Sequence, residues 1–234
     1  RIDYKNLKSL ILKRKEEGES VGIGFGYFVE KSGLGPFDDV ILSIKENVSI
    51  QLITGAASVG QGIETSLSQI VSETLGVAYT SIEVIHGQTK QIERGMGAFA
   101  TRVTVMTGSA TLNASLLLKK QILNLASEKL QKKVDDLSIE DGIIFSKDQK
   151  IGSSISIEEL YKLSPNNLDQ FIAKNTFETN QMTYPYGIHF AQVKIDKMTS
   201  GIEIERFLIA YDIGKSINPM LGDGQLVGGA AQGI

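Results

Sequence analysis

Residues 49–76 read SIQLITGAASVGQGIETSLSQIVSETLG and predict a strand, a glycine-bearing loop and a helix in direct succession. The apolar run Ser49–Thr54 has the length of a strand. Gly76 ends the helix, whose apolar side chains recur at helical spacing at Ile63, Leu67, Ile70, Val71 and Leu75. The backbone N–H groups at the start of such a helix are open to a ligand, so this segment predicts a binding site.

Strand and helix signals alternate along the rest of the chain. They predict helices at 2–15 and from Ala100 or Thr101 to Lys132, and strands at 21–30, 40–46, 81–86, 189–194 and 202–211. The expected fold class is α/β (α+β), with two lobes that are each a small twisted sheet with packed helices. We expect the first lobe at 1–134, a polar connecting segment at 135–180 and the second lobe at 181–234, truncated at its C-terminus.

The two ends of the chain share one order of elements. In 22–73 and in 187–234, a hairpin that begins with a glycine-bearing strand is followed by a small-residue loop, a Gly-Gln pair and a helix. This order predicts an internal duplication, in which Gln61 and Gln225 occupy matching places. Chance similarity of two hairpin units is the alternative.

The composition excludes several classes of protein. The 234 residues contain 24 Lys and Arg, 27 Asp and Glu and no cysteine, so thiolate metal sites and iron-sulfur clusters held by this chain are excluded. The near-neutral charge argues against a nucleic-acid partner. No apolar run is long enough for a membrane span and no signal-peptide pattern is present, so we expect no membrane association and a cytoplasmic protein. Because the chain starts on Arg1 and stops as a new element begins, we also expect a fragment.

Several short stretches resemble known functional motifs but lack a residue or context that the motif requires. Residues 214–216 read GKS, but a P-loop needs a glycine where Ile209 stands. Residues 22–26 read GIGFG within a strand signal, which is not the dinucleotide fingerprint. His86 and His189 are too few for a metal cluster, and we expect each to be a hydrogen-bonded structural histidine. No nucleophile elbow is present.

Two glycine-flanked stretches are better candidates. In 60–62 the glycines allow a ligand to approach the backbone, and the carboxamide of Gln61 can donate to and accept from a heterocycle edge. In 95–104, small residues, hydroxyls and Arg102 lie at the start of a long helix, as a pyrophosphate requires. A helix cap with an exposed arginine is the simpler alternative. Together the stretches predict a large, phosphorylated, heterocyclic ligand.

Three motifs in a fixed order carry a family resemblance. They are GQG-x-E-T at 60–65, G-x-G-x-F-A-T-R at 95–102 and Y-D-x-G-x-x-I-N-P at 211–219, followed by the Gly-Gln pair at 224–225. From Val21 onward the chain resembles the C-terminal part of the molybdenum-binding large subunit of the xanthine dehydrogenase, aldehyde oxidase and carbon monoxide dehydrogenase family.

The resemblance implies a molybdenum–molybdopterin cofactor in its cytosine dinucleotide form, with no direct metal ligand from this chain. The cofactor-binding residues it implies are Gly60, Gln61, Gly62, Phe99, Ala100, Thr101 and Gln225. We add Arg102 and Thr104 as phosphate ligands from their chemistry. The family's general base, a glutamate, is expected beyond Ile234, so no catalytic residue is assigned here. Glu64 and Glu73 are expected to be surface carboxylates on a helix.

The implied reaction oxidises an aldehyde, an N-heterocycle or carbon monoxide with oxygen from water. Electrons would pass to FAD and 2Fe-2S clusters on partner subunits, in a dimer of heterotrimers. Two alternatives stay open: a non-catalytic cofactor-binding fragment or scaffold, and an ordinary nucleotide-binding enzyme.

Overall fold

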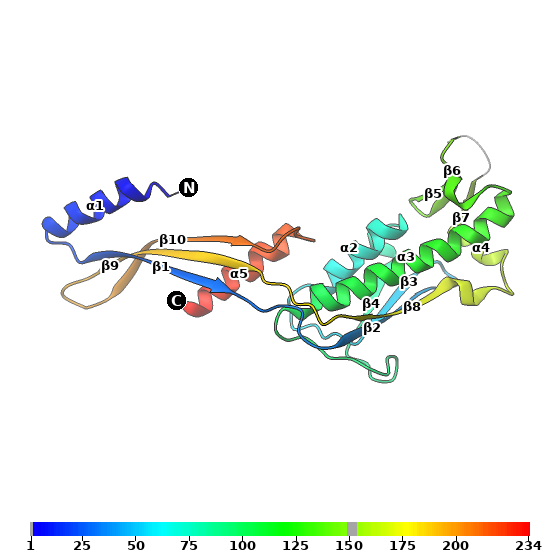
Figure 1. Ribbon diagram of the computed structural model, residues 1–234, viewed down its shortest axis with the longest axis horizontal. Coiled ribbons are helices and arrows are strands. Elements are labelled where there is room, and N and C mark those ends of the chain that lie inside the picture. Colours follow the sequence, from blue (N-terminus) through cyan, green and yellow to red (C-terminus); the bar gives the residue numbers. More distant parts are fainter. Residues whose placement is uncertain (1, 149–153) are drawn as a thin grey trace. The chain divides into compact units, whose positions relative to one another are not determined.

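The computed structural model describes residues 2–148 and 154–234 and contains both helices and strands (Figure 1). Its α-helices are α1 (Tyr4–Glu16), α2 (Ile63–Leu75), α3 (Arg102–Leu130), α4 (Ile157–Lys162) and α5 (Pro219–Gly233), and its 3-10 helices are η1 (Tyr79–Ser81), η2 (Val134–Asp136) and η3 (Leu168–Phe171). Its strands are β1 (Val21–Val29), β2 (Phe37–Ile44), β3 (Ile50–Thr54), β4 (Ile82–Ile85), β5 (Leu137–Glu140), β6 (Ile143–Ser146), β7 (Ser154–Ser156), β8 (Ile172–Glu178), β9 (Tyr186–Ile195) and β10 (Ile202–Asp212). Among the helices described, none combines the length and the apolar character needed to cross a bilayer.

The chain folds into two units whose bounds differ from those of the predicted lobes. Unit 1 comprises the residues up to 31 and residues 184–216, and unit 2 comprises 32–183 and 217–234. The difference arises because β1 pairs along its length with β9, which is distant in sequence. The expected hairpin between β1 and the next strand is therefore wrong, and the predicted internal duplication loses that part of its basis.

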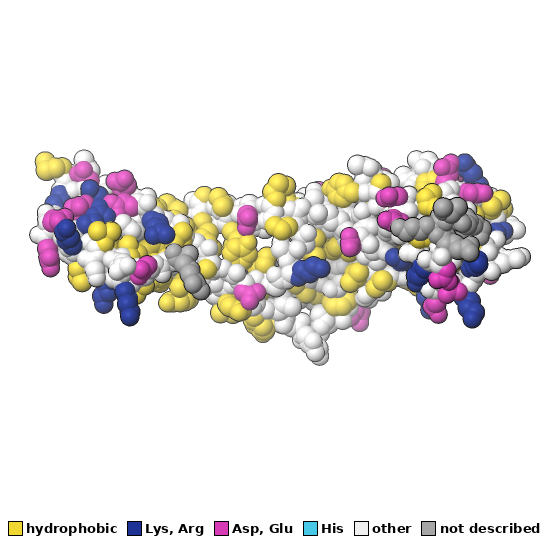
Figure 2. All heavy atoms as spheres, turned by 90° about the horizontal axis from the view of Figure 1, so that it is seen from above, with side chains coloured by type: hydrophobic (Ala, Val, Ile, Leu, Met, Phe, Trp, Pro, Cys, Tyr) yellow, Lys and Arg dark blue, Asp and Glu magenta, His cyan; other side chains and the backbone are white. Residues whose placement is uncertain are grey.

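Unit 1 is a three-stranded antiparallel sheet in the order β1-β9-β10, with α1 packed against it. The apolar contact consists of Leu7 and Ile11 from α1 and of Val21 and Phe190 from the sheet. Ion pairs surround this contact, since the Arg14 guanidinium binds the carboxylates of Glu19 at 2.7 Å and Glu205 at 2.6 Å. Figure 2 shows acidic and basic side chains mixed over the part of unit 1 that carries α1.

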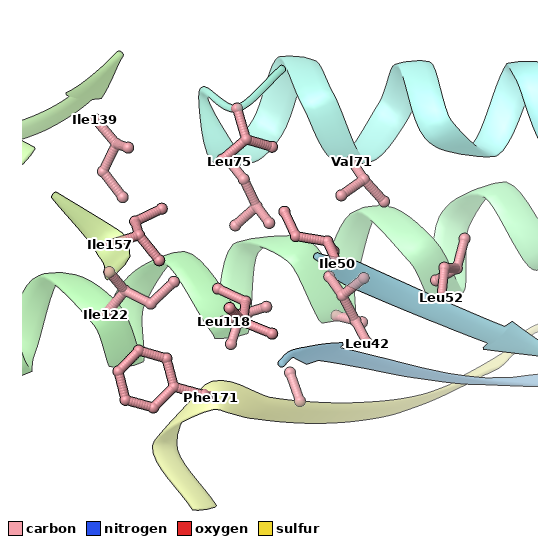
Figure 3. Packing of buried hydrophobic residues seen from close by; sticks show 14 of the residues in the cluster. Leu42, Ile50, Leu52, Val71, Leu75, Leu118, Ile122, Ile139, Ile157 and Phe171 are labelled. Carbon is pink, nitrogen blue, oxygen red and sulfur yellow. The ribbon is translucent and has the colours of Figure 1, made fainter. Parts of the chain in front are cut away.

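Unit 2 contains the main core, built on a four-stranded sheet in the order β4-β3-β2-β8. β3 and β4 are parallel and α2 connects them, whereas β2 is antiparallel to both of its neighbours. Figure 1 shows α2 and α3 over the same face of this sheet, and a second sheet, β5-β6-β7, extends the same core. Figure 3 shows side chains from these helices and strands directed into one space, including those of Leu42, Ile50, Val71, Leu118 and Phe171.

The segment that opened the sequence analysis folds as predicted. β3 is followed by the glycine loop, and α2 runs from Ile63 to Leu75. Gly76 ends α2 at a φ of 68°, and a Cβ at this position would lie 2.3 Å from the Ile139 carbonyl oxygen. Glycine is therefore required at this helix end for its conformation and for the space it leaves.

Candidate functional site

Both glycine-flanked stretches lie in unit 2, each at the start of a helix. The residue before α2 is Gly62 with φ 80°, and the residue before α3 is Thr101 with φ 51°. Neither helix has a side-chain hydrogen bond from its N-cap residue. In both helices the first-turn N–H groups therefore lack the usual N-cap acceptor.

The second stretch contacts the backbone at the start of the loop that leads to the first stretch. A Cβ built on Gly55, directly after β3, would lie 2.3 Å from the Cα of Gly95. The N–H of Gly97 also donates to the Gly55 carbonyl at 3.1 Å. The start of the loop between β3 and α2 therefore packs directly against the start of the second stretch.

The carboxamide of Gln61 is bonded within its own loop. Its Oε1 accepts from the Val59 N–H at 2.6 Å, and its Nε2 donates to the Ala57 carbonyl at 3.0 Å. Gly60 between them has a φ of 92°, which a side chain would disfavour. The loop thus contains a donor and an acceptor, and hydrogen bonds to a ligand can replace these two internal bonds.

Asn218 of the third motif is hydrogen-bonded to α2, the helix that follows the first stretch. Its Oδ1 accepts from the Leu221 N–H at 3.0 Å and so caps α5, while its Nδ2 donates to Gln69 Oε1 of α2 at 3.0 Å. Leu221 fills the space beside Gly62, where a Cβ would lie 2.8 Å from Leu221 Cδ1. The expected equivalence with Gln61 fails for Gln225, because Gln225 is an exposed residue within α5 whereas Gln61 precedes its helix.

Two consecutive residues of the second stretch have strained backbones. Ala100 has a φ of 45° and Thr101 a φ of 51°, a region that non-glycine residues rarely adopt. Ser32 secures this turn, since its hydroxyl donates to the Thr101 carbonyl at 2.9 Å and accepts from Thr101 Oγ1 at 2.6 Å. Strain of this kind concentrates at ligand sites, where the surrounding structure holds it in place.

Arg102 is buried, which the sequence did not predict. It is fully buried, and its guanidinium donates to the carbonyls of Leu34, Phe37 and Gly97 and to Asp38 Oδ2, at distances of 2.7 to 3.1 Å. It is neither the exposed arginine of a simple cap nor free for a phosphate. Burial raises the pKa of the Asp38 carboxyl above its usual range, although hydrogen bonds from Thr107 and Arg102 oppose the shift.

The other predicted phosphate ligand and the aromatic residue of the stretch are accessible. Thr104 is exposed on the first turn of α3, and Phe99 is 45% exposed. The guanidinium carbon of Arg102 lies 5.4 Å from the centre of the Phe99 ring, so Arg102 also packs against that ring. Phe99, Ala100, Thr101 and Thr104 thus lie together around the start of α3.

A carboxylate lies at the start of α2. Glu64 Oε1 is 2.9 Å from His86 Nε2, so His86 is the hydrogen-bonded histidine we expected. Burial acts to raise the pKa of Glu64, but hydrogen bonds from its own backbone N–H, Ser58 and His86 outweigh that effect and hold the pKa below its usual range. Within the described ranges, no group of three His, Asp or Glu side chains could hold a metal ion.

Sequence reasoning missed four contributors to this region: Ser32, Asp38, Gly55 and Asn218. Asn218 belongs to the quoted I-N-P motif and precedes a proline, which is a helix-start signal that could have identified it. The other three act through tertiary contacts, for which the local sequence holds no signal.

The chain is similar to several known proteins. The family model described as a molybdopterin cofactor-binding domain matches residues 1–234. The 6-hydroxypseudooxynicotine dehydrogenase complex subunit gamma of Paenarthrobacter nicotinovorans is 35% identical over 225 residues, which are 94% of this chain and 28% of that protein. The carbon monoxide dehydrogenase large chain of Afipia carboxidovorans is 30% identical over 243 residues, covering 96% of this chain and 30% of that protein.

Solved structures of related proteins are also similar to this chain. Reconstituted CO dehydrogenase from Oligotropha carboxidovorans superposes with a TM-score of 0.87 at 29% identity, over 97% of this chain and 31% of that one. Quinoline 2-oxidoreductase from Pseudomonas putida 86 superposes with a TM-score of 0.86 at 25% identity, over 98% of this chain and 32% of that one. The chain thus spans less than a third of the length of each of these relatives.

Proposed function

We infer the function of this chain from one premise: it belongs to the molybdopterin cofactor-binding domain family. We propose that it is the molybdopterin-binding portion of the large subunit of a molybdenum-dependent hydroxylase or dehydrogenase. The observation that carries the proposal is the backbone contact between Gly55 and Gly95, which packs the loop that leads to the GQG stretch against the start of the second glycine stretch.

The residues present fit such a cofactor. A Cβ at Gly60 or Gly97 would meet no atom within 4 Å, so the backbone of both stretches has open space beside it. The first turn of α2 already carries a carboxylate, that of Glu64, which favours an uncharged heterocycle edge beside Gln61. The first turn of α3 carries no acidic residue, which favours the phosphates there.

We propose that direct contacts to the cofactor come from Gly60, Gln61, Gly62, Phe99, Ala100, Thr101, Thr104 and Gln225. Gln61 would exchange its bonds within the loop for bonds to the ligand, and Thr104 would present its hydroxyl to a phosphate. For Arg102 we propose a supporting role, because direct contact would break bonds that the buried guanidinium makes to Asp38 and three carbonyls. The bound cofactor supplies the redox chemistry that moves two electrons from the substrate.

We further propose a cytosine dinucleotide form of the cofactor, partner subunits that carry FAD and 2Fe-2S clusters in a dimer of heterotrimers, and a cytoplasmic location. The substrate class is an aldehyde, an N-heterocycle or carbon monoxide. Among relatives, one is named for 6-hydroxypseudooxynicotine, one for nicotine and one for carbon monoxide.

The test is metal analysis of the full-length protein together with mass spectrometry of the cofactor released from it. We expect stoichiometric molybdenum and a pterin dinucleotide. Binding of cytidine nucleotides in a protein that lacks pterin would instead support an ordinary nucleotide-binding enzyme. Bound pterin without turnover of any of the three substrate classes would support a non-catalytic scaffold.

A further inference from the structure

Two arginines enclose the loop that leads into α3. Arg94 lies directly before residues 95–101, which we call the 95–101 loop, and Arg102 lies directly after them as the first residue of α3. The structure describes every residue of this loop, and none of them belongs to a helix or a strand. The conformation of the loop therefore depends on contacts with other segments.

The carboxylates that bind these two arginines are neighbours in the sequence. Arg94 donates from Nε and Nη2 to the two carboxylate oxygens of Asp39, at 2.9 and 3.0 Å, which is a bidentate pair. Arg102 donates from Nη1 to Asp38 Oδ2 at 3.0 Å. Both aspartates lie near the start of β2, where successive side chains point to opposite faces of the sheet. One short segment of β2 thus binds the residues at both ends of the loop.

Phe37, the first residue of β2, also contacts both arginines. Its carbonyl accepts from Arg102 Nη2 at 2.7 Å. The guanidinium carbon of Arg94 lies 4.2 Å from the centre of its ring, within the range of a cation–π contact. The ring and the bidentate pair together fix the plane of the Arg94 guanidinium.

The pair of Arg94 and Asp39 differs from the buried pair in its exposure. The Arg94 side chain is 46% exposed and the Asp39 side chain 16% exposed, whereas Arg102 and Asp38 are fully buried. An exposed ion pair contributes little to the free energy of unfolding. The geometry of Arg94 therefore favours a local effect on the loop over an effect on the stability of the core.

Asp39 is itself held in place from the neighbouring strand. Its Oδ1 accepts from the Thr176 hydroxyl at 2.7 Å, and Thr176 lies opposite Asp39 in the pairing of β2 with β8. The acceptor for Arg94 thus belongs to a paired strand and has a partner of its own.

We propose that Arg94 is a positioning residue, which fixes the start of the 95–101 loop through Asp39. The buried pair of Arg102 and Asp38 fixes the end of the same loop. Because both carboxylates belong to β2, the two ends keep one separation, and the loop presents its backbone to the cofactor in one conformation. The proposal rests on the proposed function only in assigning the cofactor to this loop.

The first measurement is amide hydrogen exchange of peptides that cover the 95–101 loop in the full-length protein. Loss of hydrogen bonds between charged groups should accelerate exchange on the order of tenfold in Arg94→Ala and in Asp39→Ala. The double variant should exchange no faster than the faster single variant, because both substitutions remove the same pair. Arg94→Lys should lie between Arg94→Ala and the wild type, since an ammonium keeps the charge but not the two parallel bonds.

The matched control is Lys162→Ala. Lys162 of α4 binds Glu158 at 2.6 Å, so this variant also removes an exposed ion pair from unit 2, but one formed within α4. Exchange of the 95–101 loop should equal that of the wild type. Equal loop exchange in Arg94→Ala and the wild type would overturn the positioning role, as would faster exchange throughout unit 2. Additive effects in the double variant would overturn the assignment of Asp39 as the anchor.

The second measurement is molybdenum retained after dialysis. We expect Arg94→Ala to retain several-fold less than the wild type, Arg94→Lys to retain an intermediate amount and Lys162→Ala to retain as much as the wild type. Full retention in Arg94→Ala would overturn the role of this anchor in cofactor binding. Absence of molybdopterin from the wild type would overturn the proposed function instead, and the exchange data would still decide whether Arg94 holds the loop.

Discussion

Gly55 and Gly95 approach so closely that a Cβ on either would overlap the backbone of the other, at 2.3 Å for Gly55 and 2.6 Å for Gly95. One follows β3 and the other opens the stretch before α3. Their contact packs the loop that follows β3 against the stretch that precedes α3. Glycine is therefore required at both positions for this close contact.

Replacing Gly55 by Ala should lower the free energy of unfolding by about 1–3 kcal/mol, because the added methyl forces the two backbones apart. Bound molybdenum should fall in the same variant. Denaturant unfolding and metal analysis measure the two effects. The control is Gly24→Ala, since a Cβ at Gly24 meets nothing within 4 Å. Equal stability of both variants would contradict the close contact.

Truncating Gln61 should weaken cofactor binding while the fold stays intact. A lost hydrogen bond to a buried ligand group costs on the order of 1–3 kcal/mol, or roughly tenfold or more in affinity. Mass spectrometry of the released cofactor measures occupancy in Gln61→Ala and, separately, in Gln225→Ala. The exposed Gln91, which bonds to Gln88, serves as the control position. Full occupancy in either variant would remove that residue from the proposed contacts.

Breaking the buried pair of Arg102 and Asp38 should be severe. Arg102→Ala leaves the Asp38 carboxylate buried without its cation, and removal of one partner of such a pair costs about 3–5 kcal/mol. Asp38→Asn removes one charge but keeps the shape and should cost less. Thermal unfolding of both variants checks the order. A mild effect of Arg102→Ala on stability, with a large effect on cofactor phosphate binding, would restore the direct phosphate role.

The strained turn before α3 predicts an unusual tolerance for glycine. Ala100→Gly relieves a φ of 45° and should change the free energy of unfolding by less than about 1 kcal/mol. Ala100→Val places a β-branched side chain in the same conformation and should lower stability by about 1–3 kcal/mol. Denaturant midpoints distinguish the two. If Val is tolerated as well as Gly, the turn relaxes more readily than its hydrogen bonds to Ser32 imply.

Acid should weaken the attachment of α1 to the sheet of unit 1. Hydrogen bonds from Arg14 hold the pKa of Glu19 and of Glu205 at about 2, compared with 4.5 for a free glutamate. Because these values are lowered in the folded state, the stabilisation is present above pH 4.5 and is lost as the pH falls toward 2. Carboxyl NMR titration measures both values. In Arg14→Gln they should move back toward 4.5, and unchanged values would contradict the assignment.

Local signals predicted the elements around the site well. β3, the glycine loop and α2 were all predicted, because apolar periodicity and a glycine stop act over a few residues. The motifs of the loops also led to the correct family. Such signals extend over one helical turn or one strand. Each element of the site is a continuous segment of about that length, so local signals are enough to predict it.

Long-range features could not be predicted in the same way. The pairing of β1 with β9 depends on residues far apart in sequence, so adjacent strands were expected to pair instead. Arg102 was predicted to bind a phosphate, with an exposed arginine at a helix cap as the alternative, and its carbonyl partners at Leu34, Phe37 and Gly97 become visible only in the folded chain. Cofactor contacts of individual residues stay predictions until a ligand is observed.

The pairing of β1 with β9 also bears on the order in which the chain folds during synthesis. β1 leaves the ribosome before its partner strand β9, which follows only after residues 32–183, whose ends are joined by hydrogen bonds between Ser32 and Thr183. We expect β1 to remain unpaired while most of the unit 2 core forms, since domains fold as units while synthesis proceeds. Nascent chains stalled at residue 183 should leave β1 open to protease, and chains extended past β10 should protect it. The glycine-rich strand is thus a segment whose structure is delayed until β9 has been synthesised.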